Sequence, residues 1–256
     1  MPHADLGDCT LEYRTILGDA GHPALVFLHE GLGSAGLWRD FPDKVARRTG
    51  ARALVYSRAG YGHSSPLAGK RGPRFMHDEA LDVLPRLLAH LGLERPVLIG
   101  HSDGASIALI HAAHHADAVR GLVLMAPHVF VEHRTLASIA RIAETYETTD
   151  LRSRLAHHHA HVDDAFHGWS DIWLSPRFTS WSLGEEVERL ATPTLLIQSD
   201  DDPYGTLAQL DAFEAARHAQ VTRLVLRDCG HAPHRDQEAA VLDAITHFVA
   251  GIAANN

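Results

Sequence analysis

Residues 100–104 read GHSDG, which places Ser102 between two glycines where an apolar run gives way to an alanine-rich segment. The run PVLIG before it is typical of a buried strand, and ASIALIHAA after it is typical of a helix. Gly100 and Gly104 permit a tight strand-to-helix turn that projects the serine hydroxyl beside the first amides of the helix. The pattern therefore predicts a nucleophile at Ser102; the alternative is a turn that only connects two elements.

A serine hydroxyl is a poor nucleophile at neutral pH, so the prediction requires a base and a group that orients the base. His231 follows the strand-like TRLVLRD, in the segment RDCGHAPHRDQ. Asp200, Asp201 and Asp202 follow the strand-like TLLIQS. Because the carboxyl ends of parallel strands meet at one edge of a sheet, we expect these side chains to lie near Ser102.

The loop after the strand-like ALVFL reads HEGLGS and is a candidate donor for a developing oxyanion. Gly31 and Gly33 free the backbone of this loop. The amide of Gly31, or less favourably that of Leu32, could meet the amide of Asp103 across a substrate oxygen. The alternative is an ordinary glycine turn.

Apolar runs and helical patterns alternate along most of the chain. The strand-like runs cover residues 11–17, 24–29, 51–56, 97–100, 119–125, 194–198 and 222–226, and the helical segments cover 38–49, 76–91, 105–115, 206–216 and 237–252. This order predicts an α/β fold, a mostly parallel sheet of about eight strands covered by helices on both faces. Pro85 lies inside a helical segment and predicts a kink or break there.

Residues 128–190 depart from the alternation, because they show helical and aromatic patterns and no convincing strand. They predict a helical cap inserted into a core formed by 1–127 and 191–256. Its aromatic residues are candidates for a pocket wall or for packing of the cap on the core; they are Phe166, Trp169, Trp173, Phe178 and Trp181. The tract HHHAH at 157–161 could suggest a metal, but adjacent histidines on a helix point in different directions, so we expect solvated side chains.

Composition excludes several classes of function. The chain has 256 residues, 45% of them hydrophobic, and a formal net charge of -9 without an extended cluster of lysine or arginine, which argues against binding to nucleic acid or anionic membranes. Cys9 and Cys229 have no redox or metal-ligand spacing, and no apolar run is long enough to cross a bilayer. We expect a cytoplasmic protein that acts on a small molecule, without a metal or cofactor.

Five motifs together resemble the α/β-hydrolase fold superfamily over almost the whole chain. In chain order they read HEGLGS, YSRAGYGHSS, GHSDG, QSDDDPYG and GHAPH. The resemblance implies Ser102 as nucleophile, His231 as base and Asp202 as acid. Asp202 is preferred because the family's acid usually lies three residues after a strand-end glycine, whose place Ser199 takes here; Asp201 is the alternative.

Two carboxylates depart from the family's pattern. Glu30 follows His29 where a glycine is usual, and Asp103 follows the nucleophile where small or apolar residues are common. Both would oppose an oxyanion unless they point away or are paired. We hypothesise that the guanidinium of Arg58 offsets Glu30 or Asp103; a solvated turn residue is the alternative.

The resemblance implies a serine hydrolase, with a carboxylic ester as the default substrate. One alternative is hydrolysis of a carbon–carbon bond in a vinylogous diketone, which needs a cation in the pocket; Arg58 is the candidate. A ligand receptor with slow turnover is another alternative, and the sequence does not indicate an oligomeric state. The residues expected to contact substrate are Glu30, Leu32, Arg58, His128, Trp169 and Trp173.

Overall fold

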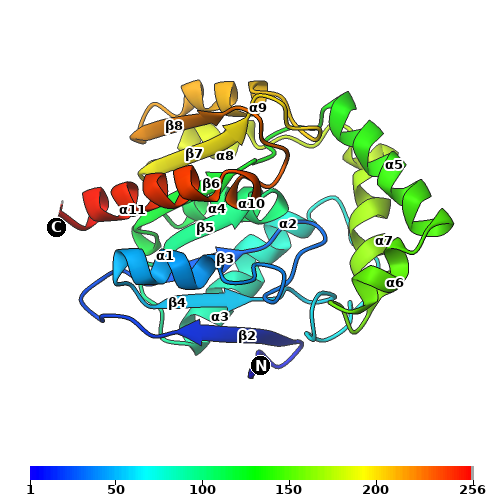
Figure 1. The fold of residues 1–256 in the computed structure, drawn as a ribbon, viewed down its shortest axis with the longest axis horizontal. Helices are drawn as coiled ribbons and strands as arrows, with labels where there is room; N and C mark the ends of the chain where they lie inside the picture. The colour runs from blue at the N-terminus through cyan, green and yellow to red at the C-terminus, as the bar shows by residue number, and fades with distance from the viewer. Residues whose placement is uncertain (255–256) are drawn as a thin grey trace.

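The computed structural model describes residues 1–254 and contains one eight-stranded sheet in the order β1-β2-β4-β3-β5-β6-β7-β8 (Figure 1). The strands are β1 (His3–Asp5), β2 (Thr10–Ile16), β3 (Leu25–Leu28), β4 (Ala53–Tyr56), β5 (Val97–His101), β6 (Gly121–Met125), β7 (Thr194–Ser199) and β8 (Val221–Leu226). Strands β3 to β8 are parallel, whereas β1 and β2 pair antiparallel at one edge. The predicted fold class is confirmed. The short edge strand β1 had no apolar run to indicate it.

Helices cover both faces of the sheet. The α-helices are α1 (Phe41–Thr49), α2 (Phe75–Asp78), α3 (Leu84–His90), α4 (Asp103–His114), α5 (His133–Thr148), α6 (Leu151–Ala156), α7 (Val162–Trp173), α8 (Gly184–Arg189), α9 (Ala208–Asp211), α10 (Pro233–Asp236) and α11 (Glu238–Ala254). Short 3-10 helices cover Ala116–Ala118, Pro176–Phe178 and Ala212–Ala215. Helices α1 and α11 pack together over one face, and α4 lies against β5 and β6 on the other (Figure 1).

The helical segment that contains Pro85 is interrupted, as predicted. Glu79–Val83 form a π-helical turn between α2 and α3, in which the amide of Leu84 donates to the carbonyl of Glu79. The carbonyl of Ala80 would receive the next amide, but Pro85 has no N–H to donate. The buried ring of His111 on α4 donates from Nδ1 to this carbonyl instead, at 2.8 Å. The interruption is therefore satisfied by a neighbouring helix.

The segment between β6 and β7 is helical, and most of it stands at one end of the sheet. Helices α5, α6 and α7 lie there together (Figure 1). Tyr146 and Phe166 stack at 3.7 Å between ring centroids, and Trp173, Phe178 and Trp181 form a second aromatic group. Helix α8 packs instead against α4 of the core. The division of the chain at 128–190 stays a prediction.

His159 contradicts the expectation of solvated histidines in the cap. Helix α6 ends at Ala156, so the histidine tract lies in a turn and not on a helix. The His159 ring is buried; its Nδ1 accepts the amide of Gly62 at 3.0 Å and its Nε2 donates to the carbonyl of Leu32 at 3.2 Å. His159 thus ties the turn between α6 and α7 to the loops that follow β3 and β4.

Two further observations concern metal-ion sites and helices that could cross a membrane. Within residues 1–254, no group of three or more histidine, cysteine, aspartate or glutamate side chains is arranged to hold a metal ion. None of the helices in this part of the chain combines the length and apolar character that crossing a membrane requires.

The hydrogen bonds of His159 predict a loss of stability in acid. Burial lowers its pKa from 6.5 to about 4, and protonation of Nδ1 would abolish the acceptor for the Gly62 amide. The unfolded chain binds this proton first as the pH falls below 6.5, so the stabilisation present above that pH declines towards pH 4. At pH 5 the loss is about 2 kcal/mol from this residue. Urea unfolding at pH 7.5 and pH 5 measures it.

The matched variants are His159→Gln and His158→Gln, since His158 is the exposed neighbour in the same tract. We expect His159→Gln to lower the free energy of unfolding at pH 7.5 and to flatten its decline towards pH 5. His158→Gln should leave both values close to those of the native chain. An unchanged pH slope in His159→Gln would contradict the role assigned to this ring.

Candidate active site

Ser102 occupies a strained turn between β5 and α4. Its backbone angles are φ 54 and ψ -120, in a region that non-glycine residues rarely adopt. The amide of Ser102 donates to the carbonyl of Met125 on β6, which holds the turn against the neighbouring strand. A Cβ at Gly104 would lie 2.1 Å from the carbonyl oxygen of Leu28, and one at Gly100 would lie 2.4 Å from that of Gly104. Both glycines are required because backbones approach closely here.

Ser102, His231 and Asp202 form one chain of hydrogen bonds. The Nε2 atom of His231 lies 3.0 Å from Ser102 Oγ, and its Nδ1 lies 2.8 and 2.9 Å from the two Asp202 oxygens. A carboxylate only accepts, so Nδ1 carries the proton and Nε2 is free to accept from the serine. The three residues follow β5, β7 and β8, whose carboxyl ends share one edge of the sheet.

The environment of Asp202 favours its charged form. Burial acts to raise the pKa of this carboxyl, but the charge of His231 and hydrogen bonds from His231 and the Tyr204 amide outweigh burial, so the pKa lies below its ordinary value. Asp201, the alternative acid, is exposed and does not contact His231. Ser199, at the place of the expected glycine, donates its hydroxyl to the carbonyl of Cys229 and accepts the Asp201 amide at 3.0 Å.

The loop after β3 lies beside Ser102. Gly31, Leu32 and Asp103 all line the same cavity as the serine hydroxyl. Apart from bonds within helices, neither the Gly31 amide nor the Asp103 amide donates a hydrogen bond to another group within residues 1–254. A Cβ at Gly31 would lie 2.2 Å from the indole Nε1 of Trp169, so helix α7 packs directly on this loop. That these two amides bind an oxyanion stays a prediction.

The cavity at Ser102 has a volume of about 100 Å³. Its lining includes five of the six residues predicted to contact substrate, namely Glu30, Leu32, His128, Trp169 and Trp173. Thr135 and Ile139 of α5 and Tyr204 of the loop after β7 complete it, and nothing local in the sequence indicated them. Burial lowers the pKa of His128 to about 3, so this ring is neutral at ordinary pH.

Of the two carboxylates that Arg58 was predicted to offset, its charge acts on Asp103, whereas it forms no ion pair with Glu30. Its guanidinium is buried, does not line the cavity, and donates to the backbone carbonyls of His29 and Glu30 at 2.5 and 3.1 Å. The Glu30 carboxylate lies instead 3.5 Å from His101 Nδ1 and 3.7 Å from an Arg235 nitrogen. A guanidinium that binds two successive carbonyls fixes the backbone of the loop, and does not pair with its carboxylate.

The two carboxylates of the cavity have opposite environments. Burial acts to raise the pKa of Glu30, but the neighbouring His101, followed by His234 and Arg235, holds it well below its ordinary value. Burial also raises the pKa of Asp103, and there the more distant charges of Arg58 and Arg71 oppose it only in part. Glu30 is therefore compensated by the protein, whereas Asp103 is not.

Comparisons with known proteins agree with this geometry. A model of the alpha/beta hydrolase fold matches residues 23–148. A proline iminopeptidase from Lactobacillus delbrueckii subsp. bulgaricus is 30% identical over 278 residues, which cover 93% of this chain and 93% of that protein. The chain belongs to the α/β-hydrolase fold family. The predicted membership of this family of enzymes is confirmed.

Other relatives of this α/β-hydrolase differ in activity. An sn-1-specific diacylglycerol lipase from Mus musculus is 25% identical, with 97% of this chain and 88% of that protein covered. A carboxylesterase structure from the Thaumarchaeon Nitrososphaera gargenis matches with a TM-score of 0.79 at 19% identity, covering 100% of both chains. The family is thus shared by relatives that act on different substrates, and the substrate must be argued from the site.

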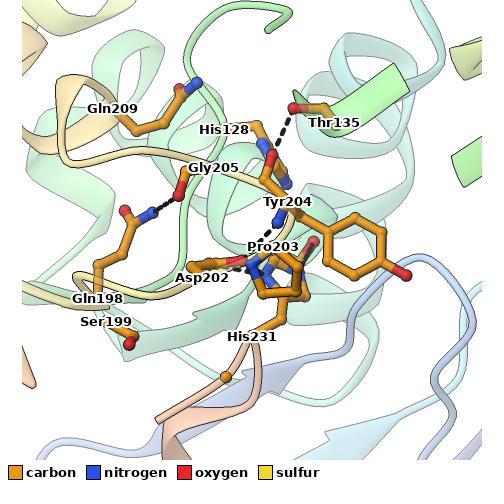
Figure 2. A network of polar contacts seen from close by, with 12 residues as sticks. His128, Thr135, Gln198, Ser199, Asp202, Pro203, Tyr204, Gly205, Gln209 and His231 are labelled. Carbon is orange, nitrogen blue, oxygen red and sulfur yellow. Dashed lines mark hydrogen bonds and ion pairs between the residues drawn. The ribbon is translucent and has the colours of Figure 1, made fainter. Parts of the chain in front are cut away.

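Helix α5 of this α/β-hydrolase holds the loop that carries Asp202 (Figure 2). Arg134 donates to the carbonyl of Asp202 at 2.8 Å, Thr135 to that of Tyr204 at 2.5 Å and Ser138 to that of Pro203 at 2.7 Å. Figure 2 also shows Gln198 donating to Gly205 at the other end of the same loop. The first turn of α5 therefore positions both Asp202 and the pocket residue Tyr204.

The close approach of α4 to β3 predicts that Gly104→Ala destabilises the fold. The added methyl group would meet backbone atoms of Leu28 and His29, which cannot rotate away. We expect a loss of roughly 1–3 kcal/mol in the free energy of unfolding, measured by urea titration. Gly251→Ala in α11 is the control, because nothing lies within 4 Å of its Cβ; it should be neutral or stabilising by up to about 1 kcal/mol. Equal stability of the two variants would rule out the tight packing at Ser102.

Proposed function

We propose that the protein hydrolyses a carboxylic ester, with Ser102 as nucleophile, His231 as base and Asp202 as the acid that orients the base. The observation that carries this proposal is the hydrogen-bonded chain from Ser102 Oγ through His231 to the Asp202 carboxylate. The buried and charged Asp202 stabilises the imidazolium that forms when His231 takes the serine proton.

The reaction follows from these contacts. As His231 Nε2 removes the hydroxyl proton, Ser102 Oγ attacks the carbonyl carbon, and the amides of Gly31 and Asp103 receive the oxyanion. Collapse of the tetrahedral intermediate breaks the bond to the alcohol, which takes the proton from His231. Water, activated by the same ring, then attacks the acyl-enzyme, and the acid leaves.

The size of the cavity indicates a small acyl or alcohol group. Its volume of about 100 Å³ is less than that of an engineered cavity of about 150 Å³ that accommodates benzene. The indoles of Trp169 and Trp173 and the side chain of Ile139 supply its apolar wall. These contacts favour short substituents next to the reacting carbonyl.

The lining argues against the carbon–carbon hydrolase alternative. That reaction was expected to need a cation for a substrate carboxylate, and Arg58 was the candidate. The cavity residues include the two carboxylates of Glu30 and Asp103, and within residues 1–254 no lysine or arginine lines it. An anionic substrate would be repelled here, so the ester proposal is favoured.

Labelling with a fluorophosphonate tests the proposed nucleophile. The reagent should add once to the native chain, because only an activated serine attacks it, and intact mass detects the adduct. Ser102→Ala should give no adduct and should lose at least about a thousandfold of ester hydrolysis.

Ser106→Ala is the control, since Ser106 lies on α4 and donates to the carbonyl of His128. This folded variant should still be labelled. Absence of an adduct on the folded native protein would contradict the proposal and favour a ligand receptor.

The choice of acid is tested by replacing each candidate with asparagine. Asp202→Asn removes the carboxylate that holds His231 in the reactive tautomer, so we expect kcat to fall by about 10³- to 10⁴-fold. Asp201→Asn changes an exposed neighbour in the same loop and should alter kcat by less than about twofold. Hydrolysis of p-nitrophenyl acetate supplies both rates. The reverse order of effects would assign the acid to Asp201.

A further inference from the structure

Asp103 lines the cavity beside the nucleophile, and one of its carboxylate oxygens is buried without a partner in residues 1–254. The residue is 1% exposed, and its Oδ1 accepts from the indole Nε1 of Trp173 at 3.2 Å. Its Oδ2 is buried and has no hydrogen-bond partner in residues 1–254. Because buried carboxylate oxygens are costly when unpaired, this oxygen points to a donor that comes from outside the chain.

The nearest arginines are engaged elsewhere. Arg58 donates to the carbonyls of His29 and Glu30, and Arg71 donates to the Tyr61 hydroxyl at 2.6 Å and to the carbonyl of Ala59 at 3.3 Å. Neither forms an ion pair with Asp103 in the described part of the chain. Their charges act on this carboxylate only from a distance. A donor with a positive charge would meet no competing cation at Oδ2.

The rest of the lining supplies no donor to Asp103. Glu30 already faces His101 and Arg235, His128 is neutral, and Thr135 donates its hydroxyl to the carbonyl of Tyr204. The oxyanion of the reaction would develop beside the negative charge of Asp103, which raises its energy. A positive group bound to Asp103 would remove that opposition.

We infer that the acyl group of the substrate carries a protonated amine that donates to Asp103 Oδ2. Asp103 directly follows Ser102, so the amine must lie within a few bonds of the reacting carbonyl carbon. A cavity of about 100 Å³ admits a small acyl group. The substrate class is therefore an ester of a small amino acid. This inference rests on the proposed ester hydrolysis and adds the charged group that the site selects.

The test compares kcat/KM at pH 7 for the benzyl esters of L-alanine, N-acetyl-L-alanine and propanoic acid. The native protein should prefer the alanine ester over the propanoate ester by roughly ten- to a hundredfold, as a charged hydrogen bond provides. The acetylated ester, which has no charge, should have a kcat/KM close to that of the propanoate ester. Asp103→Asn keeps an oxygen for Trp173 but loses the negative charge, so the ratio of alanine to propanoate ester should fall towards one.

Glu30→Gln is the matched variant, since it removes the other carboxylate of the cavity. It should retain the preference for the alanine ester. The ratio separates binding of the amine from a structural role of Asp103, because a distorted site slows both esters alike. A ratio near one in the native protein overturns the inference, as does a preference that persists in Asp103→Asn or disappears in Glu30→Gln alone.

A second measurement needs no variant. L-Alaninamide, but not propanamide, should slow fluorophosphonate labelling of Ser102 in the native protein, because only the former carries the amine. Equal protection by both compounds overturns the inference. If Ser102 is labelled but L-alaninamide protects it no better than propanamide does, the proposed nucleophile still holds and only the substrate class is wrong. Failure of both labelling and ester hydrolysis removes the proposed function itself.

Discussion

The left-handed turn at Ser102 is the constraint on which the rest of the structure depends. A non-glycine residue in this conformation costs of order 1–3 kcal/mol and persists only where its surroundings determine it. Here the preceding strand pairs with β3 and β6, and the following helix is buried along most of its length. The short approach of α4 to Leu28 requires glycine at 104. Strand β5 and helix α4 are both fixed by their neighbours, and together they hold the serine at the cavity.

Helices α5 to α7 and the turn after α6 contact three loops of the sheet, and two of these loops carry groups of the site. The first turn of α5 binds three successive carbonyls of the loop that holds Asp202, and His159 binds the loops after β3 and β4. Trp169 of α7 lies directly over Gly31. These contacts fix helices α5 and α7 relative to the loops of the site. The position of the pocket wall and the geometry of the reacting groups are therefore coupled.

The parts of the site that could be predicted from the sequence are those with local signals. Ser102, Asp202 and His231 each follow a strand, and the rule that parallel strands end at one edge was enough to bring them together. Thr135 and Tyr204 could not be predicted, because their contact joins segments 69 residues apart. The hydrogen-bond partners of Arg58 could not be predicted for a related reason. An arginine near two carboxylates suggests an ion pair, but backbone carbonyls compete for the same guanidinium, and only the fold shows which are closer.

The difference between a direct contact and a distant charge also accounts for the different pKa values of the two carboxylates of the cavity. Glu30 faces His101 at the end of β5 and Arg235 of α10, and these neighbours favour its charged form. Asp103 has one indole N–H and otherwise only distant charges. Two carboxyl groups in one small cavity are thereby driven to different pKa values, because they differ both in their partners and in their exposure, Asp103 being 1% exposed and the Glu30 side chain 21%. The unbalanced charge lies on the residue that follows the nucleophile, where a bound substrate comes within reach of it.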